Sequence, residues 1–244
     1  VSDLQVSTMC SLWSGMGHIY KVTLPNRSRD IVAVKHVAPP RKSSNTAGDR
    51  RKADSYQVEA NFYEKLAPIL ISEHHLRLPR PLVVERNSGK NKNQVVICMS
   101  FVQTTAAASH VTTTVSEKHN AVLTWLATLH AAYWGNEAAN GAVQECGLQQ
   151  IGSYWHLDTR PDEHASMPER NWEGRLKRAA RAIDWRLKRD PLQCIIHGDA
   201  KDANILHNNN KGVTLCDFQY CGKGPPTKDL AYYFFSSVGS LDED

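Results

Sequence analysis

The character of the sequence changes near residue 104, and this change limits the folds that the chain can adopt. Before it, short runs of β-branched residues alternate with turn-forming residues, a pattern typical of strands. After it, apolar residues recur at helical spacing. We therefore expect an α+β fold with two lobes. One is an antiparallel β-sheet lobe over residues 1–103, and the other is a mostly helical lobe over residues 104–244.

The expected elements of the first lobe differ in how strongly the sequence marks them. Strands are expected over residues 7–13, 19–24, 31–37, 81–86 and 94–102. Segment 39–54 has no apolar period and is rich in Pro, Ser and charged residues, so we expect a mobile loop there. A helix is expected from about Ser55 to Ala67, because Tyr56, Ala60 and Tyr63 fall on one face with Ala67.

Bulk composition excludes several classes of partner. The net charge of +4 is small and the cations form no single stripe, so no nucleic-acid partner is expected. No apolar run approaches the roughly 20 residues that a membrane helix needs, so no membrane partner is expected. The six cysteines lack paired spacing, which favours free thiols in a reducing, cytoplasmic setting. The sequence predicts no particular oligomeric state.

Polar side chains follow two short apolar runs near the end of the chain. Asp199 leaves the first run, Asn204 lies five residues on, and Asp217 ends the second run. Oxygen atoms on adjacent strand ends can converge, and Mg²⁺ binds through such ligands together with phosphate oxygens. We therefore expect Asn204 and Asp217 to hold Mg²⁺ and Asp199 to accept a proton from an attacking hydroxyl. Lys201 is expected to reach the transferred phosphoryl group.

A second set of candidate residues lies in the β-rich lobe. Lys35 ends the strand-like run V-A-V-K, and Glu59 lies on the following helix, so we expect the two to pair and Lys35 to anchor ATP phosphates. The turn containing Ser14, Gly15 and Gly17 is expected to cover the phosphates with backbone N–H groups. The simpler alternatives are an ordinary hairpin turn and, for Lys35, a charged residue protecting a strand edge.

These motifs resemble a known family. HGDAKDANIL followed by CDFQYCGKGPPTKDLAYYF is similar to the choline kinase and aminoglycoside phosphotransferase group, especially its ecdysteroid-kinase-like branch. That branch is similar also in LATLHAAYWG (Leu126 to Gly135) and in E-x-x-F-Y from Glu59. The resemblance implies a two-lobed protein-kinase-like fold that uses ATP and magnesium to phosphorylate a small-molecule hydroxyl. It also implies a structural role for Asp229, which would brace the catalytic loop. His197 is expected to brace the loop by hydrogen bonds rather than to move protons.

Departures from the protein-kinase pattern narrow the range of possible acceptors. Gly198 stands where protein kinases place the Arg of H-R-D, and Gln219 replaces the Gly of D-F-G. Only a short stretch separates Gln219 from Asp229, which favours a small acceptor over a protein. Choline, an aminoglycoside, a sterol and other alcohols stay open as acceptors, and a nucleotide-binding pseudokinase or interaction module stays open as the alternative function. The family usually continues further, so we expect the helical lobe to be incomplete.

Aromatic residues of the second lobe allow two interpretations. Trp125, Trp172 and Trp185 fall on or beside helical stripes, so we expect them in the core. Trp155, Tyr220 and Tyr232 are less regular and are candidates for an acceptor pocket or a cation cage, although aromatic residues more often pack than bind.

Overall fold

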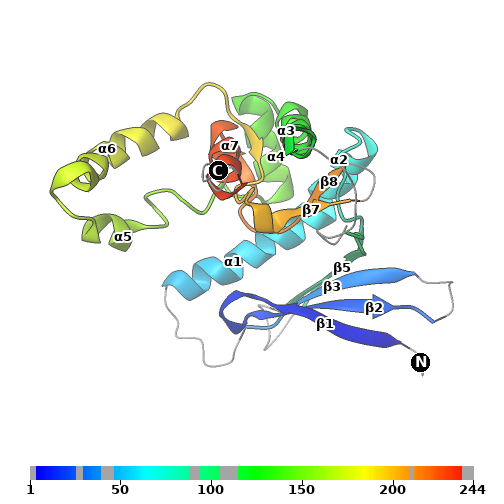
Figure 1. Ribbon diagram of the computed structural model, residues 1–244. Helices are drawn as coiled ribbons and strands as arrows, with labels where there is room; N and C mark the ends of the chain where they lie inside the picture. Colours follow the sequence, from blue (N-terminus) through cyan, green and yellow to red (C-terminus); the bar gives the residue numbers. More distant parts are fainter. Residues whose placement is uncertain are drawn as a thin grey trace. The chain divides into compact units, whose positions relative to one another are not determined.

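The computed structural model, drawn as a ribbon in Figure 1, contains two compact units. The first unit comprises Val1–Trp125 with Ala203–Gln219, and the second comprises Leu126–Asp202 with Tyr220–Asp244. The structure describes residues 4–25, 30–39, 47–87, 94–104, 115–208 and 212–237. The first unit thus takes in a segment from late in the sequence, so its contacts do not follow the expected division after residue 103. The expected roles of residues 1–103 in ATP binding and of residues 104–244 in catalysis stay predictions.

The first unit contains a five-stranded antiparallel sheet of order β1-β2-β3-β5-β4. The strands are β1 (Gln5–Ser11), β2 (Gly17–Thr23), β3 (Ile31–Val37), β4 (Pro81–Arg86) and β5 (Val95–Ser100). Alternate residues of β5 are buried, among them Val95, Ile97 and Met99, because successive side chains of a strand point to opposite faces. The edge strand β1 is exposed along its whole length. The α+β fold class expected from the sequence is confirmed.

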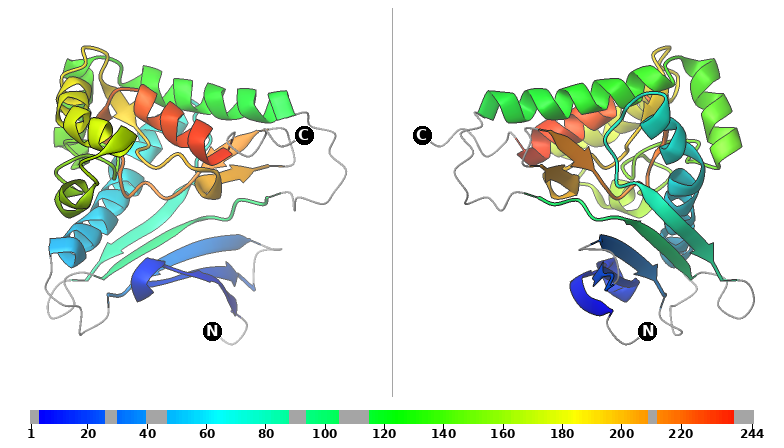
Figure 2. Two further views of the ribbon diagram at one scale, coloured as in Figure 1. Left: turned by 60° about the vertical axis from the view of Figure 1, so that its left-hand side comes forward. Right: turned by 90° about the vertical axis from the view of Figure 1, so that its right-hand side faces the viewer.

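One helix begins earlier than expected. Helix α1 covers Ala47–Asn61, continues through a π-helical turn at Phe62–Leu66, and is followed by α2 (Ala67–Ser72). The prediction of a mobile loop over 39–54 is therefore wrong for residues 47–54, while 40–46 lie outside the described residues. Arg51 and Asp54 in this part of α1 are exposed. The segment has no apolar period, yet its Ala, Arg and Lys residues favour helix intrinsically. Helix α1 contacts β5 of the sheet (Figure 2).

A late hairpin completes the first unit. Strands β7 (Ile205–His207) and β8 (Val213–Leu215) pair antiparallel, and Ile205 faces Leu215. A 3₁₀ turn at Asp202–Asn204 leads into β7. Two candidate site residues flank this hairpin. Asn204 lies just before β7, and Asp217 lies just after β8.

The second unit is mostly helical. Its helices are the end of α3 (Val115–Ala132), α4 (Asn136–Cys146), α5 (Pro161–Ser166), α6 (Asn171–Lys188) and α7 (Thr227–Ser237). Strand β6 (Cys194–Ile196) pairs antiparallel with β9 (Gly222–Gly224). In the part of the chain that the structure describes, no helix is both long enough and apolar enough to cross a membrane.

The tryptophans divide by environment. Trp125 is buried as expected, and its indole N–H donates to the Arg77 carbonyl oxygen at 2.7 Å. Trp172 and Trp185 of α6 are 63% and 55% exposed, so the prediction that they lie in the core is wrong. Helical spacing identifies a shared face but does not show that another element covers it.

Candidate functional site

A buried ion pair joins strand β3 to helix α1. The Nζ atom of Lys35 lies 2.6 Å from Oε2 of Glu59, and the two residues are 4% and 1% exposed. The contact expected from the sequence is present, although 24 residues separate the partners. The Lys35 ammonium also lies 5.4 Å from the centroid of the Tyr56 ring, a cation–π distance. Lys35 is therefore held from α1 on two sides and does not protect an exposed strand edge.

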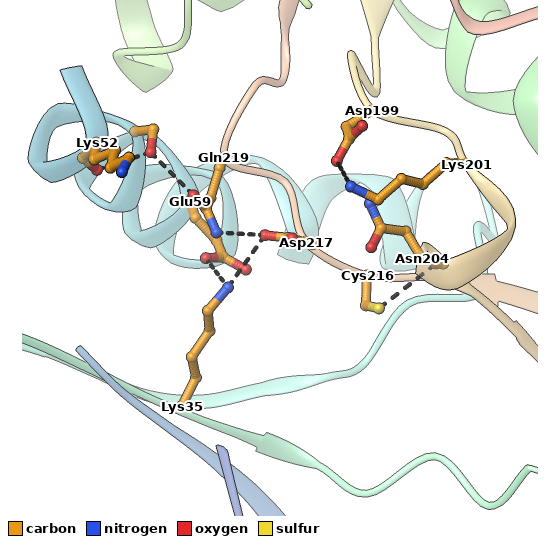
Figure 3. A network of polar contacts seen from close by, with 10 residues as sticks. Lys35, Lys52, Glu59, Asp199, Lys201, Asn204, Cys216, Asp217 and Gln219 are labelled. Carbon is orange, nitrogen blue, oxygen red and sulfur yellow. Dashed lines mark hydrogen bonds and ion pairs between the residues drawn. The ribbon is translucent and has the colours of Figure 1, made fainter. Parts of the chain in front are cut away.

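Asp217 joins the same cluster from the end of strand β8 (Figure 3). Its Oδ1 atom lies 3.2 Å from Lys35 Nζ and accepts a 2.6 Å hydrogen bond from the Gln219 amide. The Oε1 atom of Gln219 in turn lies 3.0 Å from the Ser55 hydroxyl of α1. The sequence identified Asp217, but Ser55 was missed and Gln219 was noted only as a departure from D-F-G.

Charge and burial act against each other in this cluster. Burial alone would lower the pKa of Lys35, but the Asp217 and Glu59 carboxylates raise it above its ordinary value. Burial raises the pKa of Glu59, whereas the ammonium at 2.6 Å opposes that rise, and we place the proton on Lys35. Burial also raises the pKa of Tyr56 to about 12. Lys35 is thus a cation at neutral pH, ready to face an anionic ligand.

Backbone geometry brings Asn204 and Asp217 to neighbouring ends of the β7–β8 hairpin. The backbone oxygen of Asn204 accepts a 3.0 Å bond from the amide of Cys216, the residue before Asp217. Asp217 has a φ of +67°, a left-handed conformation that non-glycine residues seldom adopt and that is found at functional turns. An amide oxygen and a carboxylate fit Mg²⁺, which uses one or two carboxylates plus phosphate oxygens rather than a full protein cage. No group of three His, Cys, Asp or Glu side chains suited to a metal occurs among the described residues.

An aromatic cluster fixes the residue after Asp217. Phe218 is fully buried and stacks on Phe62 with ring centroids 3.7 Å apart and an interplanar angle of 9°. Tyr63 meets the edge of the Phe218 ring at 5.8 Å, and Trp125 lies 6.3 Å away. The π-helical turn that supplies Phe62 and Tyr63 therefore anchors the segment that carries Asp217.

The second unit holds the remaining polar candidates. Asp199 is 7% exposed, and its Oδ2 atom lies 2.7 Å from the Nζ atom of Lys201 (Figure 3). The amide of Asp199 lies 3.2 Å from Nδ1 of His197. A carboxylate in such a position can accept a proton from a hydroxyl.

Asp229 holds the segment just before Asp199. Its carboxylate is fully buried and accepts bonds from the backbone amides of His197 and Gly198, each at 2.8 Å. The Nε2 atom of His130 lies 2.9 Å from the same carboxylate. Gly198 has a φ of +85°, and a Cβ there would lie 2.1 Å from the carbonyl oxygen of Tyr220. The loop before Asp199 is thus fixed from several sides.

We expect Asp229→Asn to lower the free energy of unfolding by about 3–5 kcal/mol, the usual effect of breaking a buried charge cluster. Burial alone would raise the pKa of Asp229, but bonds from His130 and the backbone hold it below its usual value. Because the folded pKa is depressed, this contribution is full at neutral pH and declines as pH falls below about 4. Urea denaturation at pH 7 checks the value. Asp162→Asn is the matched control, since Asp162 is exposed; equal stabilities of the two variants would contradict the prediction.

The glycine turn is a 3₁₀ turn, η1 (Trp13–Gly15), between the paired strands β1 and β2. Ser14 and Gly15 belong to it, and Gly15 has a φ of +68° with open space around it. Gly17 has a φ of +140°, and a Cβ there would lie 2.0 Å from the His36 carbonyl oxygen. The pairing of β2 with β3 therefore requires a glycine at position 17. The S-G-M-G motif alone did not indicate this requirement.

Comparisons with known proteins found a matching family and similar solved structures. The family described as "APH: Phosphotransferase enzyme family" matches residues 32–243. No curated protein matches the chain. A thermostable mutant of the aminoglycoside phosphotransferase APH(4)-Ia is 12% identical, with a TM-score of 0.55 over 95% of this chain and 72% of its own.

Two further solved structures resemble the chain. Choline kinase LicA from Streptococcus pneumoniae is 14% identical, with a TM-score of 0.53 over 97% of this chain and 70% of its own. Amicoumacin kinase hAmiN, solved with AMP-PNP and Ca²⁺, is 13% identical, with a TM-score of 0.57 over 98% of this chain and 66% of its own. At these identities the likeness concerns the fold, and the expected kinase-like fold is confirmed.

Proposed function

Because the chain belongs to the phosphotransferase enzyme family, we propose that it transfers the terminal phosphoryl group of ATP to a hydroxyl of a small molecule. The observation that carries this proposal is the cluster of Lys35, Glu59 and Asp217. A buried cation fixed between two carboxylates is a costly arrangement for stability alone, and it suits an anionic ligand that brings its own metal.

In the first unit we assign the nucleotide and metal roles. Lys35 binds the α- and β-phosphates, and Glu59 holds Lys35 in place through their 2.6 Å contact. Asn204 and Asp217 hold Mg²⁺, which when bound neutralises charge on the phosphate oxygens. Ser14, Gly15 and Gly17 cover the phosphates with their backbone, a role that is separate from the packing reason for Gly17.

In the second unit we assign the acid–base role. The acceptor oxygen attacks the γ-phosphorus while its proton passes to the Asp199 carboxylate. The bond from the γ-phosphorus to the bridging oxygen breaks, and ADP leaves with that oxygen. Lys201, 2.7 Å from Asp199, holds the carboxylate in place and offsets charge on the transferred group. Asp229 and His197 act structurally by holding the loop.

The finer assignments rest on the sequence motifs. HGDAKDANIL and CDFQ favour the ecdysteroid-kinase-like branch over the other branches of the choline kinase and aminoglycoside phosphotransferase group. The acceptor belongs to the small alcohols rather than to proteins, because the segment between Gln219 and Asp229 is short. All six cysteines are free, which supports a cytoplasmic protein.

A screen with γ-labelled ATP tests this function. The chain is incubated with Mg²⁺ and with alcohols and amino alcohols that include choline, aminoglycosides and sterols. We expect label to move to one acceptor class, and to stay on ATP when Mg²⁺ is removed by chelation. ATP binding without transfer to any acceptor would instead support a nucleotide-binding pseudokinase.

A further inference from the structure

A ring of polar contacts connects helix α1 to Asp217 by two routes (Figure 3). On one route Glu59 of α1 holds Lys35 at 2.6 Å, and Lys35 contacts Asp217 Oδ1 at 3.2 Å. On the other, Ser55 of α1 contacts Gln219 Oε1 at 3.0 Å, and Gln219 Nε2 donates to the same Oδ1 at 2.6 Å. Ser55 and Glu59 are four residues apart, so both lie on one face of α1 and close the ring.

The second route depends on the chemistry of an amide. The two ends of the Gln219 side chain face different partners, and only the nitrogen can donate to the Asp217 carboxylate. The Ser55 hydroxyl has a single proton, which the Lys52 carbonyl oxygen at 2.8 Å and Gln219 Oε1 share. Ser55 is 1% exposed, so this link is shielded from water. A hydrogen bond to a charged group is among the stronger ones in proteins.

The ring bears on how Asp217 is oriented. Its backbone is in a left-handed conformation, and both donors converge on Oδ1, so the neighbouring side chains fix the carboxylate. We propose that Gln219 is a positioning residue whose amide ties the Asp217 carboxylate to Ser55, so that α1 sets the orientation of both Lys35 and Asp217. This inference rests on the proposed function, in which Asp217 holds Mg²⁺ and Lys35 binds phosphate.

If Gln219 positions Asp217, its effect on metal binding should be coupled to that of Ser55, which would not hold for a residue that only stabilises the fold. Loss of the Gln219 amide leaves the Lys35–Glu59 contact in place, so phosphate binding without metal persists. Ser55 acts only through Gln219 in this scheme, so its removal has no further effect once the amide is gone. The two residues are therefore expected to be non-additive in metal binding.

ATP affinity measured calorimetrically with and without Mg²⁺ tests the coupling. We compare wild type with Gln219→Met, Ser55→Ala, the double variant and Gln94→Ala. The control removes an amide whose oxygen accepts an exposed 2.7 Å hydrogen bond from Asn87, between the end of β4 and the start of β5. We expect Gln219→Met to reduce the Mg²⁺-dependent gain in ATP affinity about tenfold and Ser55→Ala to reduce it somewhat less. The double variant should match Gln219→Met, and Gln94→Ala should match wild type.

Hydrogen exchange of the metal-free protein supplies a readout independent of the nucleotide. Amides of α1 around Ser55 and Glu59 should exchange faster in Gln219→Met and Ser55→Ala than in Gln94→Ala. If Mg²⁺ increases ATP affinity by the same factor in wild type and in both variants, the positioning role is wrong while the proposed function stands. If the wild type gains none, the proposed metal site is wrong, and the positioning role is wrong with it. If Gln219→Met does not fold, Ser55→Ala alone decides by the same criteria.

Discussion

Replacing Asp199 by Asn should lower the kcat for acceptor phosphorylation by about 10²–10⁴-fold, the usual contribution of a general base. The amide has nearly the same shape but cannot accept the acceptor's proton, and it loses the ionic attraction to Lys201 at 2.7 Å. ATP affinity should change little, because the Lys35 cluster lies in the other unit. The variant therefore separates nucleotide binding from transfer.

Single-turnover kinetics and an ATP titration measure the two properties. Asp202→Asn is the matched control, since this neighbouring Asp is exposed. Wild-type turnover by Asp199→Asn on the true acceptor would remove Asp199 from the mechanism. Equal slowing of both Asn variants would point to a disturbance of the loop rather than to loss of a base.

The second large effect is expected at Asp217. Asp217→Ala should reduce the Mg²⁺-dependent part of the ATP affinity by more than about tenfold, since even residues that only orient metal ligands can be worth that much. Lys35 keeps its 2.6 Å partner Glu59 in this variant, so ATP binding without metal should persist. The carboxylate contributes only when ionised, and a bound dication favours that state.

Calorimetric titration of ATP with and without Mg²⁺ distinguishes the two parts of the affinity. Asp54→Ala is the control, because Asp54 lies on α1 with an exposed side chain. An unchanged Mg²⁺ effect in Asp217→Ala would show that this residue does not hold the metal. Loss of ATP binding in both conditions would show that Asp217 acts by holding Lys35 rather than by holding the metal.

The sequence predicted those parts of the site that short motifs encode. Lys35 and Glu59 could be paired because a strand-borne Lys followed by an acid on the next helix is a known arrangement, and the 2.6 Å contact bears this out. Ser55 and Gln219 could not be predicted as partners because 164 residues separate them. Nothing local to either residue indicates the other, and only the packing of α1 beside the segment after β8 brings them together.

The predictions of the fold were wrong where they relied on the hydrophobic pattern alone. Residues 47–54 are helical although they have no apolar period, because their propensity suffices when the following turns of α1 are buried. Trp172 and Trp185 follow a helical pattern but are exposed. An apolar stripe shows which residues share a helix face, but it does not show whether another element packs against that face. Gly17 looked like part of a phosphate-binding turn, and its steric need arises from His36 on the neighbouring strand.

The most direct test of phosphoryl transfer is the product stoichiometry with a defined acceptor. ADP and the phosphorylated acceptor are quantified together by mass spectrometry in the presence of Mg²⁺. The proposed function predicts one phosphate ester for each ADP formed, with the phosphoryl group on a hydroxyl oxygen. ADP accompanied only by inorganic phosphate, for every alcohol tested, would contradict it.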